Sequence, residues 1–217
     1  MSKITLVERT ILGLHNSLIP EIPKPNTNAS VLDIGCGTGA WLDKLGTIGF
    51  KNLHGIDIDT QQFKTERATV SRVNLDSDNL HFDSQFDLIT AIEIIEHLEN
   101  PGRIFSFVEK NLKPDGYFLL TTPNIHSLSC RLKFLVCGEL ASFDEKGDRT
   151  HIYPVLLQSL ARILPRYSLE IVKQWAYPDR GSIIYRQSTQ FISNLLELLL
   201  PNQTPGDTLC LLIQKTK

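Results

Sequence analysis

Apolar runs of strand length alternate with amphipathic segments through the middle of the chain. The runs expected to form strands are residues 30–34, 53–58, 69–75, 86–92 and 116–121. Helical spacing of apolar positions is found over 40–45, 61–65 and 101–112. Strands that alternate with helices form βαβ units, and such units build a mostly parallel sheet with right-handed crossovers. We therefore predict an α/β fold.

The two ends of the chain add further elements to this centre. We expect a helix over 4–19, a helix over 154–164 and an apolar helix over 182–200, and strands over 169–175 and 208–214. Residues 126–150 do not fit the alternation of strands and helices, so we interpret them as an insertion over the carboxyl edge of the sheet. Residues 1–217 are expected to form a single domain.

Composition narrows the class of protein and its surroundings. Hydrophobic residues make up 41% and charged residues 21% of the chain, and the net charge is -2, a balance that argues against binding to nucleic acid through phosphate neutralisation. None of the four cysteines forms a C-x-x-C pair, and no apolar run is long enough to span a membrane. The first residues do not form a convincing signal peptide. We therefore expect reduced thiols and a cytoplasmic location.

A glycine-rich loop follows the first expected strand directly. Its sequence, Asp33-Ile34-Gly35-Cys36-Gly37-Thr38-Gly39, leads into the next expected helix. Glycines let the backbone turn sharply and approach a ligand closely, since they have no Cβ atom. Ligands of open parallel sheets bind outside the carboxyl ends of the strands. The loop therefore predicts a ligand site, although nicotinamide-binding enzymes carry a related loop.

Two acidic residues and the glycine spacing narrow the choice of ligand. The spacing is G-x-G-x-G and differs from the G-x-G-x-x-G of dinucleotide binders. Asp33 stands two residues before Gly35, where a carboxylate can order the loop and meet a ligand's ammonium group. Asp57 ends the second expected strand, where a carboxylate can accept hydrogen bonds from both hydroxyls of a ribose. These features favour S-adenosylmethionine.

The segments V-L-D-I-G-C-G-T-G and G-I-D-I-D resemble motif I and the following acidic motif of class I S-adenosylmethionine-dependent methyltransferases. The resemblance covers residues 30–124 and continues more loosely to the C-terminus. It implies a doubly wound, Rossmann-like, mostly parallel seven-stranded sheet whose last strand is antiparallel. It also implies the residues that contact S-adenosylmethionine, which are Asp33, Gly35, Gly37, Gly39, Asp57, Ile58, Leu75, Asp76 and Ile92.

An acidic and histidine-containing cluster follows the fourth expected strand. Glu93, Glu96 and His97 are spaced i, i+3, i+4, which places their side chains on one face of a helical turn. Two carboxylates and an imidazole suit a divalent cation: Mg²⁺ for the oxygens, or Mn²⁺, Zn²⁺ or Fe²⁺ with the imidazole. The alternatives are that His97 acts as a metal-free base, or that Glu96 and His97 only cap a helix.

This E-x-x-E-H pattern resembles two groups of methyltransferases, the O-methyltransferases of ubiquinone biosynthesis and the enzymes that 2′-O-methylate the 3′ end of small RNAs. The resemblance implies a metal that chelates neighbouring substrate oxygens. Thr150-His151-Ile152-Tyr153 resembles the family's T-H-x-Y/F stretch, which makes His151 the candidate for the further ligand. Glu96, His97 and His151 are therefore the candidate catalytic residues.

We expect methyl transfer from S-adenosylmethionine to a small-molecule acceptor, with a hydroxyl as the favoured target and metal assistance as an option. The alternatives are 3′-terminal 2′-O-methylation of RNA and a partner subunit that binds the cofactor without catalysis. Residues 1–19, 126–150 and 182–200 are the expected lid segments. The 182–200 helix is expected to pack on the sheet, with dimerisation or membrane docking as alternatives.

Overall fold

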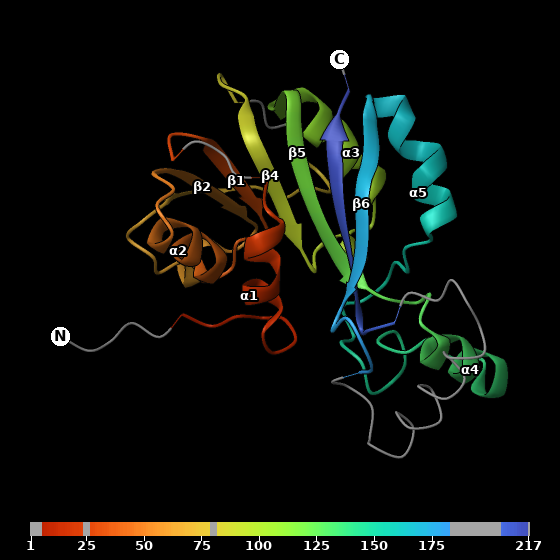
Figure 1. The fold of residues 1–217 in the computed structure, drawn as a ribbon. Helices are drawn as coiled ribbons and strands as arrows, with labels where there is room; N and C mark the ends of the chain where they lie inside the picture. The colour runs from red at the N-terminus through yellow and green to blue at the C-terminus, as the bar shows by residue number, and fades with distance from the viewer. Residues whose placement is uncertain (1–5, 24–26, 79–81, 183–204, 217) are drawn as a thin grey trace.

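The computed structural model of the chain describes residues 6–23, 27–78, 82–182 and 205–216, and these form one seven-stranded sheet (Figure 1). The strand order is β3-β2-β1-β4-β5-β7-β6. The strands are β1 (Ser30–Ile34), β2 (Asn52–Asp57), β3 (Thr69–Arg72), β4 (Phe86–Ile92), β5 (Leu112–Pro123), β6 (Leu169–Tyr177) and β7 (Thr208–Lys215).

Strand direction confirms the predicted sheet. The pairs β1–β2, β1–β4, β2–β3 and β4–β5 are parallel, whereas β7 is antiparallel to both β5 and β6. The strand order reverses between β1 and β4, so the carboxyl ends of these two strands open the crevice where ligands bind in such sheets. The sheet therefore directs attention to the residues that follow β1, β2 and β4.

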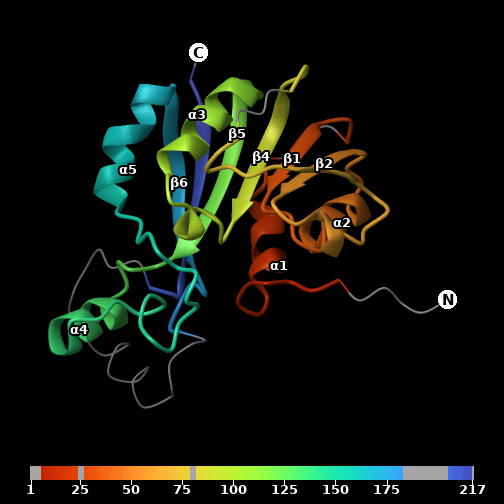
Figure 2. The ribbon, with the colours of Figure 1, turned by 180° about the vertical axis from the view of Figure 1, so that it is seen from behind.

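Helices cover both faces of the sheet (Figures 1 and 2). One face packs against α3 (Gly102–Asn111) and α5 (Leu157–Ile163), and the other against α1 (Leu14–Leu18) and α2 (Ala40–Thr47). Successive strand residues point to opposite faces, so Leu32 joins the first core and Val31 the second. Burial on both sides explains why the central strands are continuous apolar runs.

Two expected boundaries differ because tertiary contacts extend or shorten the elements. β5 begins at Leu112, four residues before the expected strand over 116–121, because Leu112 pairs with Phe86 across a bulge. The third strand ends at Arg72 and not at residue 75. The expected helix over 61–65 is a short 3-10 turn, η2 (Thr60–Gln62), which Asp59 caps.

The expected helix over residues 4–19 is wrong for most of its described length. Residues 6–13, which we call the N-terminal strap, are not helical, and only α1 and the 3-10 turn η1 (Ile19–Glu21) are. Gly13 ends the strap with φ 87°, a left-handed conformation that glycine adopts without a steric penalty. Ile11, Leu14 and Leu18 pack in the core with residues of α2 and the sheet, whereas the strap residues Val7 and Leu12 are exposed, so the apolar spacing does not correspond to one helical face.

The expected insertion over 126–150 contains one helix, α4 (Leu128–Cys137), which lies away from the sheet at its carboxyl edge (Figure 1). The Ser127 hydroxyl accepts from the Cys130 amide at its start, and Gly138 closes it with φ 73°. The turn η4 (Leu164–Tyr167) continues α5. The expected 182–200 helix lies outside the described residues after Ser182. Within the part of the chain that is described, no helix is long and apolar enough to cross a membrane.

Candidate active site

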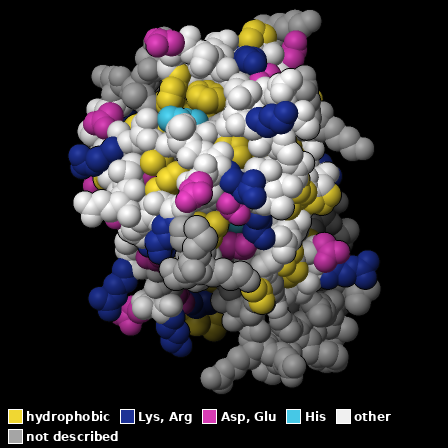
Figure 3. All heavy atoms as spheres, turned by 90° about the vertical axis from the view of Figure 1, so that its left-hand side faces the viewer, with side chains coloured by type: hydrophobic (Ala, Val, Ile, Leu, Met, Phe, Trp, Pro, Cys, Tyr) yellow, Lys and Arg dark blue, Asp and Glu magenta, His cyan; other side chains and the backbone are white. Residues whose placement is uncertain are grey.

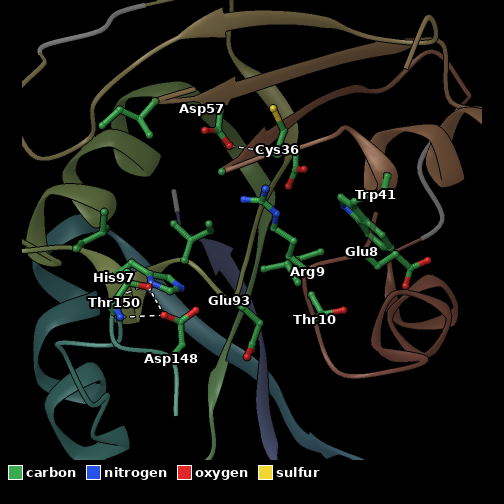
Figure 4. Close-up of a pocket in the computed structure, with 18 of the residues that line it drawn as sticks. Glu8, Arg9, Thr10, Cys36, Trp41, Asp57, Glu93, His97, Asp148 and Thr150 are labelled. Atoms are coloured by element: carbon green, nitrogen blue, oxygen red, sulfur yellow. Dashed lines mark hydrogen bonds between the residues drawn. The ribbon is translucent and has the colours of Figure 1, made fainter. Parts of the chain in front are cut away.

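A cavity of about 750 Å³ opens at the carboxyl edge of the sheet. Its wall is formed by the glycine loop, the ends of β2 and β4, the N-terminal strap and the segment 142–151. Figure 4 shows Asp57 and Cys36 at one end of this cavity and His97, Thr150 and Asp148 at another. After the roles expected from the sequence, we call the first end the cofactor half and the second the acceptor half.

The glycine loop is held by backbone and carboxylate hydrogen bonds. Gly35, Gly37 and Gly39 have φ 70°, 51° and 83°, all left-handed. The Gly35 amide donates to the Ile56 carbonyl at 2.8 Å, and the Gly37 amide donates to Asp57 Oδ2 at 2.8 Å. Asp57 therefore orders the loop itself, a role that the sequence had suggested only for Asp33.

Asp33 lies at the base of the cofactor half and is almost completely buried. The Thr90 hydroxyl donates to its Oδ1 at 2.7 Å. Burial raises the pKa of Asp33 to about 7, while the hydrogen bond from Thr90 acts in the opposite direction and the nearby charge of Asp57 adds to the rise. A cation placed beside this carboxylate would favour its ionised form, so the site suits an ammonium group.

The remaining predicted cofactor positions divide into two groups. Ile58, Leu75, Asp76 and Ile92 all line the cavity. Gly39 does not line it but begins α2, and a Cβ atom there would meet the Thr65 methyl group at 2.5 Å. Gly39 is therefore required for packing of the loop, whereas the other four positions face the cavity.

The N-terminal strap forms one wall of the cavity. The sequence predicted a helix for this segment, so its non-helical path along the cavity was not expected. The Thr38 hydroxyl donates to the Val7 carbonyl at 3.0 Å and accepts from the Val7 amide at 3.1 Å. Glu8 pairs with Lys44 of α2 at 2.9 Å, and Arg9 donates to Gln62 of η2. Figure 4 shows Arg9 reaching into the cavity from the strap. Of the two residues in this contact, only Thr38 could be singled out from the sequence, because it lies inside the glycine loop.

His97 and His151 line the acceptor half, whereas Glu96 lies beside them without lining the cavity; one potential ligand atom from each of the three lies within 4.8 Å of the others. The Glu96 side chain is 0% exposed, and within the described residues neither of its carboxylate oxygens has a hydrogen-bond partner. Burial raises the pKa of Glu96 well above its usual range and the nearby Glu93 raises it further, while the backbone and the Thr122 hydroxyl act in the opposite direction. An unpartnered buried carboxylate is costly, so this position calls for a proton or a cation.

Glu93 is not part of this set of ligand atoms, and the expected single helical face is wrong. The 3-10 turn η3 (Ile95–His97) begins only after Glu93, and Glu93 has φ 55°, a left-handed conformation, so it is not on the turn with Glu96 and His97. The Thr121 hydroxyl donates to its Oε1 at 2.9 Å. Burial raises the pKa of Glu93 to about 7, and the residue lines the cavity beside the cluster.

Both imidazoles of the cluster are oriented through Nδ1. His97 Nδ1 lies 2.8 Å from the Thr150 hydroxyl and 3.2 Å from the Thr150 carbonyl, and His151 Nδ1 lies 2.8 Å from the Ser142 carbonyl. The two ring centroids are 4.7 Å apart in an edge-to-face arrangement. The pair is joined to η3 because the Glu96 carbonyl accepts from the amides of Ile152 and Tyr153.

Two further polar side chains near the site have structural partners. The Leu157 amide donates to His126 Nε2 at 3.2 Å at the start of α5. Asn124 is buried, and its amide group donates to the Gly206 carbonyl at 3.0 Å. This bond joins β5 to the segment before β7, so Asn124 has a packing role at the edge of the site.

Comparison with known proteins agrees with this geometry. A methyltransferase domain family model matches residues 8–174. The chain is 29% identical to the ubiquinone biosynthesis O-methyltransferase of Hydrogenovibrio crunogenus over 179 residues, 73% of each chain. It is 28% identical to the protein of the same name from Neisseria meningitidis, over 65% of this chain and 63% of that protein.

A solved structure with the same fold is the Haemonchus contortus phosphoethanolamine N-methyltransferase 2 in complex with S-adenosyl-L-methionine. The TM-score is 0.65 at 16% identity, and the match covers 95% of this chain and 53% of that one. The fold, the glycine loop with its acidic partner and the family match lead to one assignment. The chain belongs to the class I S-adenosylmethionine-dependent methyltransferases.

Proposed function

We propose that this enzyme transfers the methyl group of S-adenosylmethionine to a hydroxyl of a small-molecule acceptor. The observation that carries the proposal is that one cavity joins the glycine loop and Asp57 to His97 and His151. The volume of about 750 Å³ leaves space for a second small molecule beside the cofactor. The relatives named for ubiquinone biosynthesis support an oxygen acceptor.

The cofactor would occupy the end of the cavity at the glycine loop. Asp57 would accept from the ribose hydroxyls, with Ile58 against the adenine and Leu75 and Asp76 beside its amine. Asp33 would meet the methionine ammonium group, and Ile92 would lie at the end of β4 beside the cofactor. The N-terminal strap would cover the cofactor, since its bonds to Thr38, Lys44 and Gln62 join three elements around this end.

The residues of the acceptor half fit a divalent cation. Glu96, His97 and His151 would be the ligands, and the unpartnered carboxylate of Glu96 is the observation that favours one. One carboxylate and two imidazoles suit Zn²⁺, Mn²⁺ or Fe²⁺ better than Mg²⁺, which prefers oxygen ligands. Glu93 would act beside the cation and not as a ligand in this arrangement.

A bound cation would lower the pKa of a coordinated acceptor hydroxyl. The protein's own residues would orient the acceptor, because methyl transfer requires in-line approach to the sulfonium carbon and correct orientation contributes a large part of the rate. If no cation binds, His97 or His151 would take the proton of the hydroxyl as a general base. Either role requires an imidazole nitrogen with a free lone pair.

The donor is tested by calorimetry with S-adenosylmethionine and S-adenosylhomocysteine on the full chain. We expect both to bind, and loss of both would overturn the proposal. A screen of catechols, quinols, sugars and lipids then tests the acceptor. Cofactor binding without turnover on any of these compounds would favour a partner subunit that binds the cofactor and does not catalyse.

The cation is tested separately on protein dialysed against EDTA. Titration with Zn²⁺ or Mn²⁺ should show one site in the parent chain and none in Glu96→Gln or His151→Ala. His126→Ala is the matched control, since that histidine lies outside the cluster and should leave cation binding unchanged. Unchanged methyl transfer after exhaustive chelation would remove the cation from the proposal and leave the general base.

A further inference from the structure

Asp148, Thr150 and His97 form a chain of hydrogen bonds at the wall of the acceptor half. The Thr150 hydroxyl donates to Asp148 Oδ1 at 2.6 Å, and the Thr150 amide donates to the same oxygen at 2.9 Å. His97 Nδ1 lies 2.8 Å from the Thr150 hydroxyl oxygen. Figure 4 shows the three side chains together, with Asp148 and Thr150 beside the His97 ring.

Counting the hydrogens in this chain determines which nitrogen of His97 carries the proton. The bonds from Thr150 hold the pKa of Asp148 below its usual range, so its carboxylate is ionised and can only accept. The single hydrogen of the Thr150 hydroxyl is therefore used toward Asp148. The hydroxyl oxygen can then only accept from His97, which requires a hydrogen on Nδ1.

A second contact leads to the same assignment. The Thr150 carbonyl lies 3.2 Å from His97 Nδ1 and, like every carbonyl, can only accept. In a neutral imidazole one ring nitrogen carries the hydrogen and the other keeps a lone pair. With the hydrogen on Nδ1, that lone pair is on Nε2.

We propose that Thr150 and Asp148 are positioning residues that hold His97 as its Nδ1–H tautomer and so keep a lone pair on Nε2 for the acceptor half. The cluster's other imidazole differs in how it is held, because His151 Nδ1 faces the backbone carbonyl of Ser142. Of the two imidazoles, only that of His97 is held by a relay of side chains, from Asp148 through Thr150. The catalytic consequence rests on the proposed function, but the tautomer is a property of the chain itself.

The relay matters for either role of His97. Ligation of a cation and acceptance of a proton both use a lone pair, and outer hydrogen bonds that select the tautomer are a common feature of ligating histidines. In the opposite tautomer, Nε2 would carry a hydrogen and could do neither.

Nitrogen NMR of the full chain, labelled in histidine and free of metal, tests the proposal, because protonated and unprotonated ring nitrogens have different shifts. His97→Gln assigns the His97 signals. In the parent chain we expect Nδ1 of His97 to carry the hydrogen. Asp148→Ala frees the Thr150 hydroxyl to donate, so a mixture of tautomers should form. Asp148→Asn keeps an accepting oxygen and should retain the parent tautomer.

Two threonine variants complete the test. Thr150→Val should also give a mixture, although the Thr150 carbonyl remains, and Thr150→Ser should restore the parent spectrum. Thr47→Val is the matched control, since its hydroxyl donates to the Asp43 carbonyl on α2, and it should change nothing at His97. A parent chain with the hydrogen on Nε2, or an unchanged tautomer in both Thr150→Val and Asp148→Ala, would overturn the proposal.

Calorimetry with S-adenosylmethionine on the same samples separates this proposal from the proposed function. We expect its affinity to stay within twofold in all these variants, because none of the changed residues lies in the cofactor half. If the parent chain did not bind S-adenosylmethionine, the proposed function would be overturned and the tautomer result would stand.

Discussion

The two halves of the cavity are built in different ways. In the cofactor half, the functional groups follow the ends of β1 and β2, and the backbone of one strand end binds the next, as the Gly35 and Cys36 amides do with the Ile56 carbonyl. In the acceptor half, the 3-10 turn η3 meets the segment 142–153, and the contacts that join them include imidazole nitrogens bonded to a hydroxyl and a carbonyl and backbone amides bonded to the Glu96 carbonyl.

The sheet topology therefore places the groups of the cofactor half, whereas the conformation of one loop segment places those of the acceptor half. Neighbouring parallel strands bring their carboxyl ends to one edge whatever the loops contain. The acceptor half depends on the path of one long segment, and substrate choice in this fold resides in such segments. Substitutions in the two halves should therefore have separable effects on cofactor binding and on methyl transfer.

The largest expected effect is in the cofactor half. Asp57→Ala removes the acceptor of the Gly37 amide and the proposed partner of both ribose hydroxyls. Hydrogen bonds to a charged group are worth about 1.5–3 kcal/mol each, so affinity for S-adenosylmethionine should fall about 100-fold or more. Calorimetry measures the loss. Asp59→Ala, which removes the cap of η2 and the bond from the Gln62 side chain but no proposed cofactor contact, is the control and should stay within a few-fold.

The next largest effect is the pH dependence of stability that comes from Asp33, a buried acid whose pKa is near neutral pH. The pKa of Asp33 is about 7 in the folded chain and about 4 in the unfolded chain. Between these values the folded state keeps a proton that the unfolded chain has released, so stability falls as pH rises from about 4 to 7 and stays lower above 7. At 1.36 kcal/mol per pKa unit, the change is about 2–4 kcal/mol.

Asp33→Asn cannot ionise and should lose this part of the pH dependence, measured by urea unfolding at pH 5 and pH 8. Glu93→Gln gives the matching test in the acceptor half, because burial also raises the pKa of Glu93 to about 7. If the parent chain and Asp33→Asn lost the same stability between the two pH values, Asp33 would not be the buried acid described here. Only Asp33→Asn should also weaken cofactor binding.

A smaller effect is expected where the segment 142–153 is anchored. Asp144 accepts from the amides of Lys146 and Gly147 at 3.2 and 2.9 Å and pairs with Lys133. Asp144→Ala should lower the unfolding free energy by about 1–2 kcal/mol and reduce methyl transfer, with cofactor affinity unchanged. Glu139→Ala removes only an exposed partner of Lys133 and serves as the control. A matching fall in cofactor affinity would contradict the separation of the halves.

The smallest effect concerns the N-terminal strap. Thr38→Val removes both hydrogen bonds between the glycine loop and Val7. At about 0.5 kcal/mol each, the lower end of the range for a net hydrogen bond, the two bonds together contribute about 1 kcal/mol, so dissociation of the cofactor should become about fivefold faster. Stopped-flow fluorescence of Trp41, which lines the cavity, follows the release. An unchanged rate would mean that the strap does not cover the bound cofactor.

Much of the fold follows from patterns that depend on local sequence. The central strands were predictable because burial on both faces makes them continuous apolar runs, and the glycine loop because its left-handed positions require glycine. The strap was not predictable, because its apolar spacing imitates a helix while its bonds go to Thr38 and Gln62, far along the chain.

In the acceptor half, too, the roles of single residues depend on contacts that local sequence patterns do not reveal. The spacing of Glu93, Glu96 and His97 assumed a regular helical turn, but Glu93 precedes the turn in a left-handed conformation. His151 was found through a resemblance, whereas Asp148 gave no signal, since its importance depends on the hydrogen bonds it makes in the folded loop. Thr150 appeared in the motif without a role.

The surface of the chain bears on the choice of acceptor. On the face drawn in Figure 3, basic and acidic side chains are interspersed over the described residues, without a continuous basic field. Binding of an RNA backbone depends on clustered positive charge. That face agrees with the mild net charge of -2 and with a small-molecule acceptor.

The positions of the four cysteines decide how the native chain will react with thiol reagents. Cys36, Cys130 and Cys210 are buried, and burial raises the pKa of each thiol, which suppresses the reactive thiolate. Cys137 is exposed at the end of α4. A maleimide dye should therefore attach at that one position, so the acceptor side of the molecule can carry a fluorescent label without any engineered substitution and without damage to the glycine loop.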